Sequence, residues 1–277
     1  MQKTWFITGT SRGLGLEIAK AALRAGDRVV ATARQRAPVT EALGLGGENL
    51  LSLSLDVTNA GATQAAVDAA LSQFGAIDVL VNNAGYGHLG FFEESTAAEI
   101  EAQFATNLFG VFNVTRAALP AMRAARQGRI FNLSSLAGIR GAEFASLYCA
   151  SKFALEGFSE SLAQEIAPFG LFVTIVEPGP FRTDFLTPAS IRFGDGGLSD
   201  YANRRAELRA GFEQRDGQQP GDPQKLAEAM VLLANDAHPP MRFTAGSIAV
   251  NATDAKLAAM QAELNHWRAL GVGADYT

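Results

Sequence analysis

The sequence predicts a single doubly wound α/β domain, in which a seven-stranded parallel sheet carries helices on both faces. Short apolar runs alternate with helix-length segments along nearly all of its 277 residues. The apolar runs are continuous rather than alternating in polarity, which is typical of strands buried on both faces. No stretch has the composition of a linker, so we expect residues 1–277 to form one domain.

The elements follow one another in a regular order. The expected strands are the apolar runs at residues 5–7, 29–31, 50–55, 77–81, 129–133, 171–176 and 247–250. The expected helices cover residues 14–25, 60–74, 96–119, 146–167 and 223–235. Asn59, Thr96 and Asp222 stand at the starts of three of these helices. Side chains of these types accept hydrogen bonds from the free N–H groups of a first helical turn, so we expect them to be caps.

Two segments stand apart from this alternation. Residues 180–222 are rich in Gly, Pro, Asp and Arg, and a long insertion after a strand is typical of a lid or substrate-binding loop. Residues 253–277 form a C-terminal extension with an apolar stripe at helical spacing, made of Leu257, Met260, Leu264, Trp267 and Leu270. We expect this stripe to pack on the body of the domain rather than on a membrane or a partner helix.

Composition excludes several classes of function. The net charge is −5 and there is no basic run, which argues against nucleic acid binding. No apolar stretch approaches the ~20 residues that span a bilayer, and the chain enters its first strand at once. We therefore expect a cytoplasmic protein. The single cysteine, Cys149, excludes an internal disulfide, and the scattered histidines predict no metal site.

Tyr148 and Lys152 are the most informative pair of residues. Positions i and i+4 share one face of a helix, so the ammonium of Lys152 can lie near the phenol of Tyr148. A nearby positive charge lowers the pKa of a phenol, which otherwise lies near ~10. The pair is a candidate proton donor and acceptor. Cys149, between them, is interpreted as a small buried residue, with a reactive thiol as the alternative.

A glycine-rich turn follows the first expected strand and opens the first helix. Its sequence is Thr-Gly-Thr-Ser-Arg-Gly-Leu-Gly, at residues 8–15. Glycines permit a tight turn and a close backbone approach, and the helix start offers free N–H groups to a phosphate. We predict a phosphate-binding turn, with Gly9, Ser11, Arg12, Gly13 and Leu14 in contact with a dinucleotide.

The end of the second strand indicates which dinucleotide is bound. NAD sites place a carboxylate there for the ribose hydroxyls, whereas NADP sites place an arginine for the 2′-phosphate. This chain has Ala33-Arg34 with no acidic residue nearby, and Arg12 offers a second guanidinium. Since arginine attracts the phosphate that a carboxylate would repel, we predict NADP(H) as the cofactor.

Further motifs resemble those of the short-chain dehydrogenase/reductase family, over residues 4–250. They are Asp56-Val57 after the third strand, Asn82-Asn83-Ala84-Gly85 after the fourth, Asn107 within a helix, Asn132-Leu133-Ser134-Ser135 after the fifth, and Pro178-Gly179-Pro180 with Thr183 after the sixth. Residues 176–185 and the C-terminal extension look most similar to the 17β-hydroxysteroid or retinol dehydrogenase-like branch. The resemblance implies a Rossmann-type fold, an oxidoreductase, and a homodimer or homotetramer.

The resemblance also implies roles for individual residues. The catalytic set is Asn107, Ser135, Tyr148 and Lys152, where Ser135 is preferred to Ser134 because it lies thirteen residues before Tyr148. The implied cofactor contacts, beyond the glycine-rich turn and Arg34, are Asp56, Val57, Asn83, Ala84, Gly85, Tyr148, Lys152, Pro178, Gly179 and Thr183. Asn107 would hold a water that links Lys152 to solvent, or would be only a polar residue that bends its helix.

Candidate substrate contacts come from loops at the same edge of the sheet. They are Tyr86, His88, Leu136, Ile139, Phe144, Phe181 and Phe185, and together they predict an apolar pocket with a few polar groups. His88 is also compatible with a structural loop histidine, and Arg140 and Arg192 with solvated surface residues.

The predicted activity is NADPH-dependent reduction of a ketone or aldehyde, or the reverse oxidation of an alcohol. Two alternatives remain open at this point. One is a protein that senses NADP or binds a partner without turnover, and the other is an epimerase or dehydratase on the same fold.

Overall fold

Seven parallel strands form the central sheet of the computed structural model, which describes residues 2–44, 47–194 and 196–276. They are β1 (Thr4–Thr8), β2 (Arg28–Ala33), β3 (Leu50–Ser54), β4 (Val79–Asn82), β6 (Gly128–Leu133), β7 (Leu171–Pro178) and β9 (Arg242–Ala245). Their order across the sheet is β3-β2-β1-β4-β6-β7-β9. The chain runs outward from β1 to β3 and then returns to the other side of β1 with β4. This reversal is that of a doubly wound sheet and confirms the predicted fold class.

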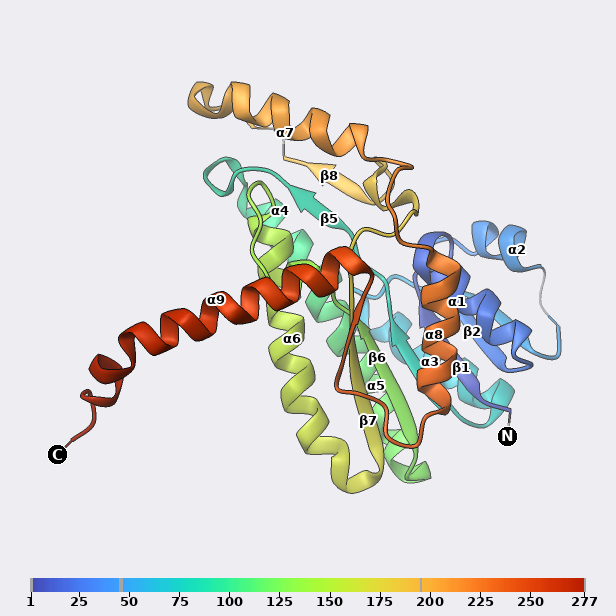
Figure 1. The fold of residues 1–277 in the computed structure, drawn as a ribbon. Helices are drawn as coiled ribbons and strands as arrows, with labels where there is room; N and C mark the ends of the chain where they lie inside the picture. The colour runs from blue at the N-terminus through green and yellow to red at the C-terminus, as the bar shows by residue number, and fades with distance from the viewer. Residues whose placement is uncertain (1, 45–46, 195, 277) are drawn as a thin grey trace.

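Helices cover both faces of the sheet (Figure 1). One face packs on α1 (Gly13–Arg24), α2 (Ala37–Leu43) and α8 (Pro223–Asn235). The other packs on α3 (Ala60–Phe74), α5 (Gly110–Ala125) and α6 (Ser146–Ile166). Trp5 and Phe6 are neighbours in β1, yet each belongs to a different one of these two cores. Because both faces are buried, the strands read as continuous apolar runs.

The predicted caps are confirmed at three helices. The Asn59 side chain accepts a hydrogen bond from the backbone N–H of Ala62 at 2.9 Å, at the start of α3. Thr96 forms a reciprocal capping box with Glu99. Asp222 accepts from the backbone N–H of Gln224 at 2.9 Å, at the start of α8. Each cap fixes where a helix begins, and so fixes the length of the connection before it.

The helix expected at residues 96–119 is divided into parts. It consists of α4 (Ala97–Phe104), a π-helical turn at Ala105–Phe109, and α5. π-helical turns inside α-helices are frequent at functional sites. Asn107 lies in this turn and is buried, so the irregular turn sets the direction of its side chain.

The prediction of a strand at residues 247–250 is wrong. The seventh strand is β9, and Gly246 ends it with a φ of +89°. Helix α9 (Ser247–Val272) begins directly afterwards, and Ala249 is buried against the body. An apolar run this short has no periodicity that separates a strand from a helix, so the sequence pattern alone could not decide.

The segment at residues 180–222 contains regular structure that the sequence did not predict. It holds a short helical turn at Asp184–Leu186, strand β8 (Ile191–Phe193), a second turn at Ser199–Tyr201, and helix α7 (Ala202–Gln214). β8 pairs in parallel with β5 (Gly87–Leu89) to form a separate two-stranded sheet. In Figure 1, α7 lies along β8 at the edge of the molecule. Three further short helical turns occupy Phe92–Glu94, Leu136–Gly138 and Ala167–Phe169.

The expectation that the C-terminal stripe packs on the body is also wrong. Its five apolar residues are exposed: Leu257 59%, Met260 53%, Leu264 57%, Trp267 57% and Leu270 71%. Figure 1 shows α9 extending past α6 and away from the rest of the molecule. Within the described part of the chain, no helix is both long enough and apolar enough to cross a membrane.

Candidate active site

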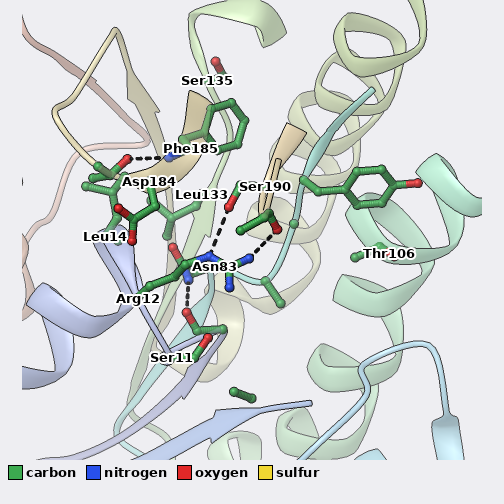
Figure 2. A pocket seen from close by; sticks show the side chains of 18 of the residues that line it. Ser11, Arg12, Leu14, Asn83, Thr106, Leu133, Ser135, Asp184, Phe185 and Ser190 are labelled. Carbon is green, nitrogen blue, oxygen red and sulfur yellow. Dashed lines mark hydrogen bonds between the residues drawn. The ribbon is translucent and has the colours of Figure 1, made fainter. Parts of the chain in front are cut away.

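A cavity of about 960 Å³ opens at the carboxyl edge of the sheet, around the ends of β1 and β4. The strand order reverses between these two strands, and ligands of doubly wound sheets bind at such a reversal. The walls come from the glycine-rich turn, the ends of β2, β3, β4, β6 and β7, helix α6, and the segment that follows β7. Figure 2 shows how side chains from these elements converge.

Every residue predicted to contact the cofactor lines this cavity. They are Gly9, Ser11, Arg12, Gly13, Leu14, Arg34, Asp56, Val57, Asn83, Ala84, Gly85, Tyr148, Lys152, Pro178, Gly179 and Thr183. Of the predicted catalytic residues, Ser135, Tyr148 and Lys152 line it as well, whereas Asn107 does not.

The glycine-rich turn is shaped for close approach. Gly9 has a φ of +73°, and a Cβ on Gly15 would lie 2.5 Å from the Gly9 carbonyl oxygen and 2.3 Å from Asn83 Nδ2. Asn83 Nδ2 donates to the carbonyls of Thr8 and Gly9 at 2.8 and 3.1 Å. No side chain caps α1, and no acidic residue stands in its first turn. The N–H groups at the start of α1 are therefore free for an anion, which fits the pyrophosphate of a dinucleotide.

The two predicted arginines take different positions. Arg34 is exposed at the end of β2, where it lines the cavity beside Asp56. Hydrogen bonds from the Thr58 N–H and hydroxyl, helped by the charge of Arg34, hold the pKa of Asp56 below its usual range. Arg12 instead reaches across to the segment after β7 (Figure 2), where it donates to the Ser190 hydroxyl at 3.2 Å and to the Ala189 carbonyl.

Tyr148 and Lys152 stand on adjacent turns of α6, with Lys152 Nζ 5.8 Å from the Tyr148 ring centroid. Lys152 Nζ donates to the Leu133 carbonyl at 2.6 Å. Burial raises the pKa of Tyr148 to about 12, against an opposing interaction with the Ser135 hydroxyl. Burial lowers the pKa of Lys152 to about 8, against the charge of Glu156. The expected lowering of the Tyr148 pKa is therefore not seen, because desolvation of the phenol is the larger effect.

The two serines after β6 face different surroundings. The Ser135 hydroxyl accepts from the Ala137 N–H at 3.1 Å and interacts with Tyr148. Ser134 also lines the cavity but is buried, and its hydroxyl lies near the Glu156 carboxyl. This arrangement supports the choice of Ser135 as the serine that accompanies the tyrosine.

Asn107 acts on the cavity wall from behind. Its Nδ2 donates to the Tyr86 carbonyl at 2.9 Å and to the Ser151 hydroxyl at 3.2 Å, and its Oδ1 accepts from the Tyr86 N–H at 3.1 Å. The side chain thus holds the backbone of Tyr86 in place. No contact between Asn107 and Lys152 appears among the hydrogen bonds of the described residues.

The predicted substrate residues divide into two groups. Tyr86, Phe181 and Phe185 line the cavity, and the Phe185 ring lies 5.8 Å from that of Tyr148. His88, Leu136 and Phe144 do not line it, so these three predictions are corrected; Ile139, considered with them, does not line it either.

The three corrections have physical reasons. His88 is only 3% exposed, and its Nε2 lies 3.2 Å from Glu99 Oε1, as expected of a structural histidine. Phe144, at a φ of +68°, turns inward and packs 5.1 Å from the Phe91 ring. Leu136 is half-buried in the helical turn that follows Ser135 and does not line the cavity.

Several wall residues escaped prediction. They are Ala102, Thr106, Leu186, Ala189, Ser190 and Gln219, while Arg192, first interpreted as a surface residue, also lines the cavity. The guanidinium of Arg192 lies 4.8 Å from the centroid of the Tyr86 ring. Pairing of β5 with β8 brings the regions around Tyr86 and Arg192 together, and no local sequence pattern predicts that pairing.

Two other kinds of chemistry find no support in residues 2–44, 47–194 and 196–276. These residues hold no group of three or more His, Cys, Asp and Glu side chains that could bind a metal ion. Cys149 is buried, and burial raises the pKa of its thiol. A thiol with a raised pKa is a weak nucleophile at neutral pH, so the alternative of a reactive Cys149 is not supported.

Comparison with known proteins agrees with this geometry. Residues 3–191 match the short chain dehydrogenase family. The chain belongs to this family. It is 37% identical to the oxidoreductase BOA17 of Botryotinia fuckeliana, over 99% of this chain and all of that protein. It is 38% identical to a 3-ketodihydrosphingosine reductase of Bacteroides thetaiotaomicron, over 87% of both chains. It is 36% identical to human retinol dehydrogenase 8, over 87% of this chain and 80% of that protein.

Solved structures show the same fold. A short-chain dehydrogenase from Streptomyces avermitilis superposes with a TM-score of 0.92 at 38% identity, over the full length of both chains. A 3-ketoacyl-(acyl-carrier-protein) reductase from Brucella melitensis, complexed with NADH, gives 0.74 at 26% identity, over 87% of this chain and 96% of that one. The short-chain dehydrogenase described here is therefore an oxidoreductase of a family that binds nicotinamide cofactors, with relatives that include a retinol dehydrogenase.

Proposed function

We propose that this short-chain dehydrogenase is an NADPH-dependent carbonyl reductase, or a reversible alcohol dehydrogenase, with Tyr148 as the general acid and base. One observation carries the proposal. A single cavity has Arg34 and a phosphate-binding turn in one part, and Ser135, Tyr148 and Lys152 in another. A dinucleotide that spans the cavity can thus place its phosphorylated adenosine near Arg34 and its reacting ring near Tyr148.

The preference for NADPH rests on Arg34. No acidic residue stands beside it at the end of β2, where a carboxylate would bind the ribose hydroxyls of NAD. Asp56, the nearest carboxylate, is already held by both donors of Thr58. Arg12 is a second candidate for the 2′-phosphate, and it would have to leave Ser190 and Ala189 to reach that phosphate.

The residues of the reacting end suit carbonyl reduction. A nicotinamide held in this cavity would supply the hydride that adds to the carbonyl carbon. Ser135 and Tyr148 donate hydrogen bonds to the carbonyl oxygen, where negative charge develops. With its pKa raised to about 12, Tyr148 keeps its proton at neutral pH and can donate it to that oxygen, yielding the alcohol. Lys152 stabilises the phenolate left behind, and in alcohol oxidation each transfer runs in reverse.

A substrate screen tests the proposal. Purified protein is incubated with a panel of ketones and aldehydes, and the absorbance of NADPH or NADH is followed. We expect turnover with NADPH, an alcohol product in equal amount, and a loss of both in Tyr148→Phe.

Two results would contradict the proposal and favour an alternative. Tight binding of NADPH without turnover across the panel would indicate a sensing or interaction protein. Conversion of substrate to an isomer or dehydrated product without net consumption of NADPH would indicate an epimerase or dehydratase.

A further inference from the structure

Residues 257–276, which are the outer part of α9 and the four residues after its end at Val272, form an arm that extends beyond the domain (Figure 1). Every residue of the arm is exposed. The base of α9 is attached differently, since Ala249 is buried and Ala252, Thr253 and Lys256 are half-buried near the helical turn Leu136–Gly138. The helix is therefore anchored at one end only.

One side of the arm is apolar. Leu257, Met260, Leu264 and Trp267 follow one another at alternating spacings of three and four, which places them in one stripe. Each of them is 53–59% exposed. At 100° per residue, Thr253 lies on the line of this stripe. The stripe thus lies on the same side of α9 as the residues at its base that contact the domain. Beyond residue 256, no part of the described chain covers it.

We propose that the stripe packs against the same stripe of a second copy of this chain, with the two arms antiparallel about a two-fold axis near residue 262. An isolated helix of this length is marginal in water. From the exposed fractions, the four side chains of the stripe offer roughly 450 Å² per arm, about half of the ~800 Å² that each partner contributes to a standard interface. A second arm can therefore cover the whole stripe, and the area corresponds to a weak, concentration-dependent dimer.

The stripe and its charged flank are self-complementary in this register. An axis near residue 262 places Leu257 opposite Trp267 of the second copy, and Met260 opposite Leu264. Asp254 and Arg268 lie on the same flank of the stripe, four turns apart. The two-fold axis brings each of them opposite the other, so two ion pairs form per dimer. Glu263 lies on the other flank near the axis, where it faces Glu263 of the second copy; exposure to water weakens this single repulsion.

The charges of the arm favour a second copy over a lipid surface. Helices that lie on membranes are rich in lysine and arginine on their polar side. Residues 254–272 carry two basic side chains, Lys256 and Arg268, and two acidic ones, Asp254 and Glu263. This balance gives no attraction to anionic lipids, whereas it suits pairing of two identical helices.

Sedimentation velocity of the full-length protein over a range of concentrations tests the proposal. We expect a dimer for the wild type. Leu264→Asp should weaken self-association by at least ~100-fold, because the two-fold axis places the buried charge at two positions. Ala262→Asp is the matched control, since it adds the same charge on the opposite side of the same arm and should leave the dimer intact. Neither residue touches the described cavity, so activity per subunit reports independently on folding.

A charge exchange tests the register. Arg268→Glu should weaken the dimer about tenfold by turning two attractions into repulsions, and Asp254→Arg combined with Arg268→Glu should restore it. A wild type that is monomeric at ~100 µM would overturn the proposal, as would a Leu264→Asp dimer as strong as that of the wild type. Binding of the monomeric wild type to phosphatidylserine vesicles, lost in Leu264→Asp, would overturn it in favour of a membrane.

Discussion

The two halves of the cavity are built in different ways. The proposed cofactor half is made by strand ends and the turns directly after them, such as Gly9 after β1 and Asn83 after β4. Its parts are joined by partly buried hydrogen bonds, for example from the Asn83 and Ala84 backbone N–H groups to the Thr8 hydroxyl Oγ1, both at 3.0 Å. The proposed substrate half is made by Tyr86, directly before β5, and by residues between β7 and α7, including Arg192 of β8; these two parts are far apart in the sequence and are joined by the pairing of β5 with β8.

The difference affects how firmly each half is held. Turns at the carboxyl ends of parallel strands are held in place by the buried strands to which they are joined. The segment around β8 is held by a short pairing to β5 and by side chains, among them Glu94, which binds Arg205 and accepts from the Gly197 and Leu198 N–H groups at 2.9 and 3.0 Å. We expect substitutions in the cofactor half to change which dinucleotide binds, and substitutions in the substrate half to change KM for the carbonyl compound.

Replacing Tyr148 with Phe at the junction of the two halves should have the largest effect. Loss of the proton donor should lower kcat by ~10²–10⁴-fold while NADPH binding changes little. Tyr86→Phe is the matched control, since it removes a phenol from the same cavity and should change kcat by less than about tenfold. Steady-state kinetics and fluorescence titration with NADPH measure both quantities. If kcat falls by the same factor in the two variants, Tyr148 is not the proton donor.

Arg34→Asp tests the cofactor half. The new carboxylate should repel the 2′-phosphate, and kcat/KM for NADPH should fall ~100-fold relative to NADH, from the loss of an attraction and the gain of a repulsion. Arg36→Asp is the control, because Arg36 is exposed but lies outside the described cavity. An unchanged cofactor preference in Arg34→Asp would show that Arg34 does not bind the phosphate.

Lys152 gives the cavity a pH dependence. Its pKa is lowered to about 8, so the ammonium is charged below that pH and neutral above it. If the charge supports proton donation by Tyr148, kcat/KM for carbonyl reduction should be level below pH ~8 and fall about tenfold per unit above it. In Lys152→Arg the charge persists to high pH, so the remaining activity should not show this fall. A profile that is identical in both proteins would assign the fall to another group.

Glu94→Gln tests the substrate half and should have the smallest effect. The variant keeps the size of the side chain but loses the charge that holds Arg205, so the segment around β8 should be less ordered. We expect KM for the carbonyl substrate to rise about threefold to tenfold, with the affinity for NADPH unchanged. If NADPH affinity falls by the same factor, the two halves are not independent and the comparison drawn here fails.

Sequence patterns located the cofactor half because its signals are local. A glycine-rich turn or an Asn-Asn-Ala-Gly motif directly after an apolar run can be assigned to a strand end, and parallel strands bring their carboxyl ends to one edge. The substrate half had no such signal. His88 lies in β5 and Phe144 in the loop before α6, and both side chains are buried without lining the cavity. Arg192, by contrast, reaches the cavity because β8 pairs with β5.

The sequence by itself determined the alternation of strands and helices, three helix caps, the glycine-rich turn at the start of α1 and the Tyr148–Lys152 pair, because each depends on neighbours within a few residues. Only the tertiary structure decided the pairing of β5 with β8, the direction of the Asn107 side chain, the raised pKa of Tyr148 and the exposure of the stripe on α9. These features depend on which distant surfaces meet and how much water they exclude, and no local pattern encodes either quantity.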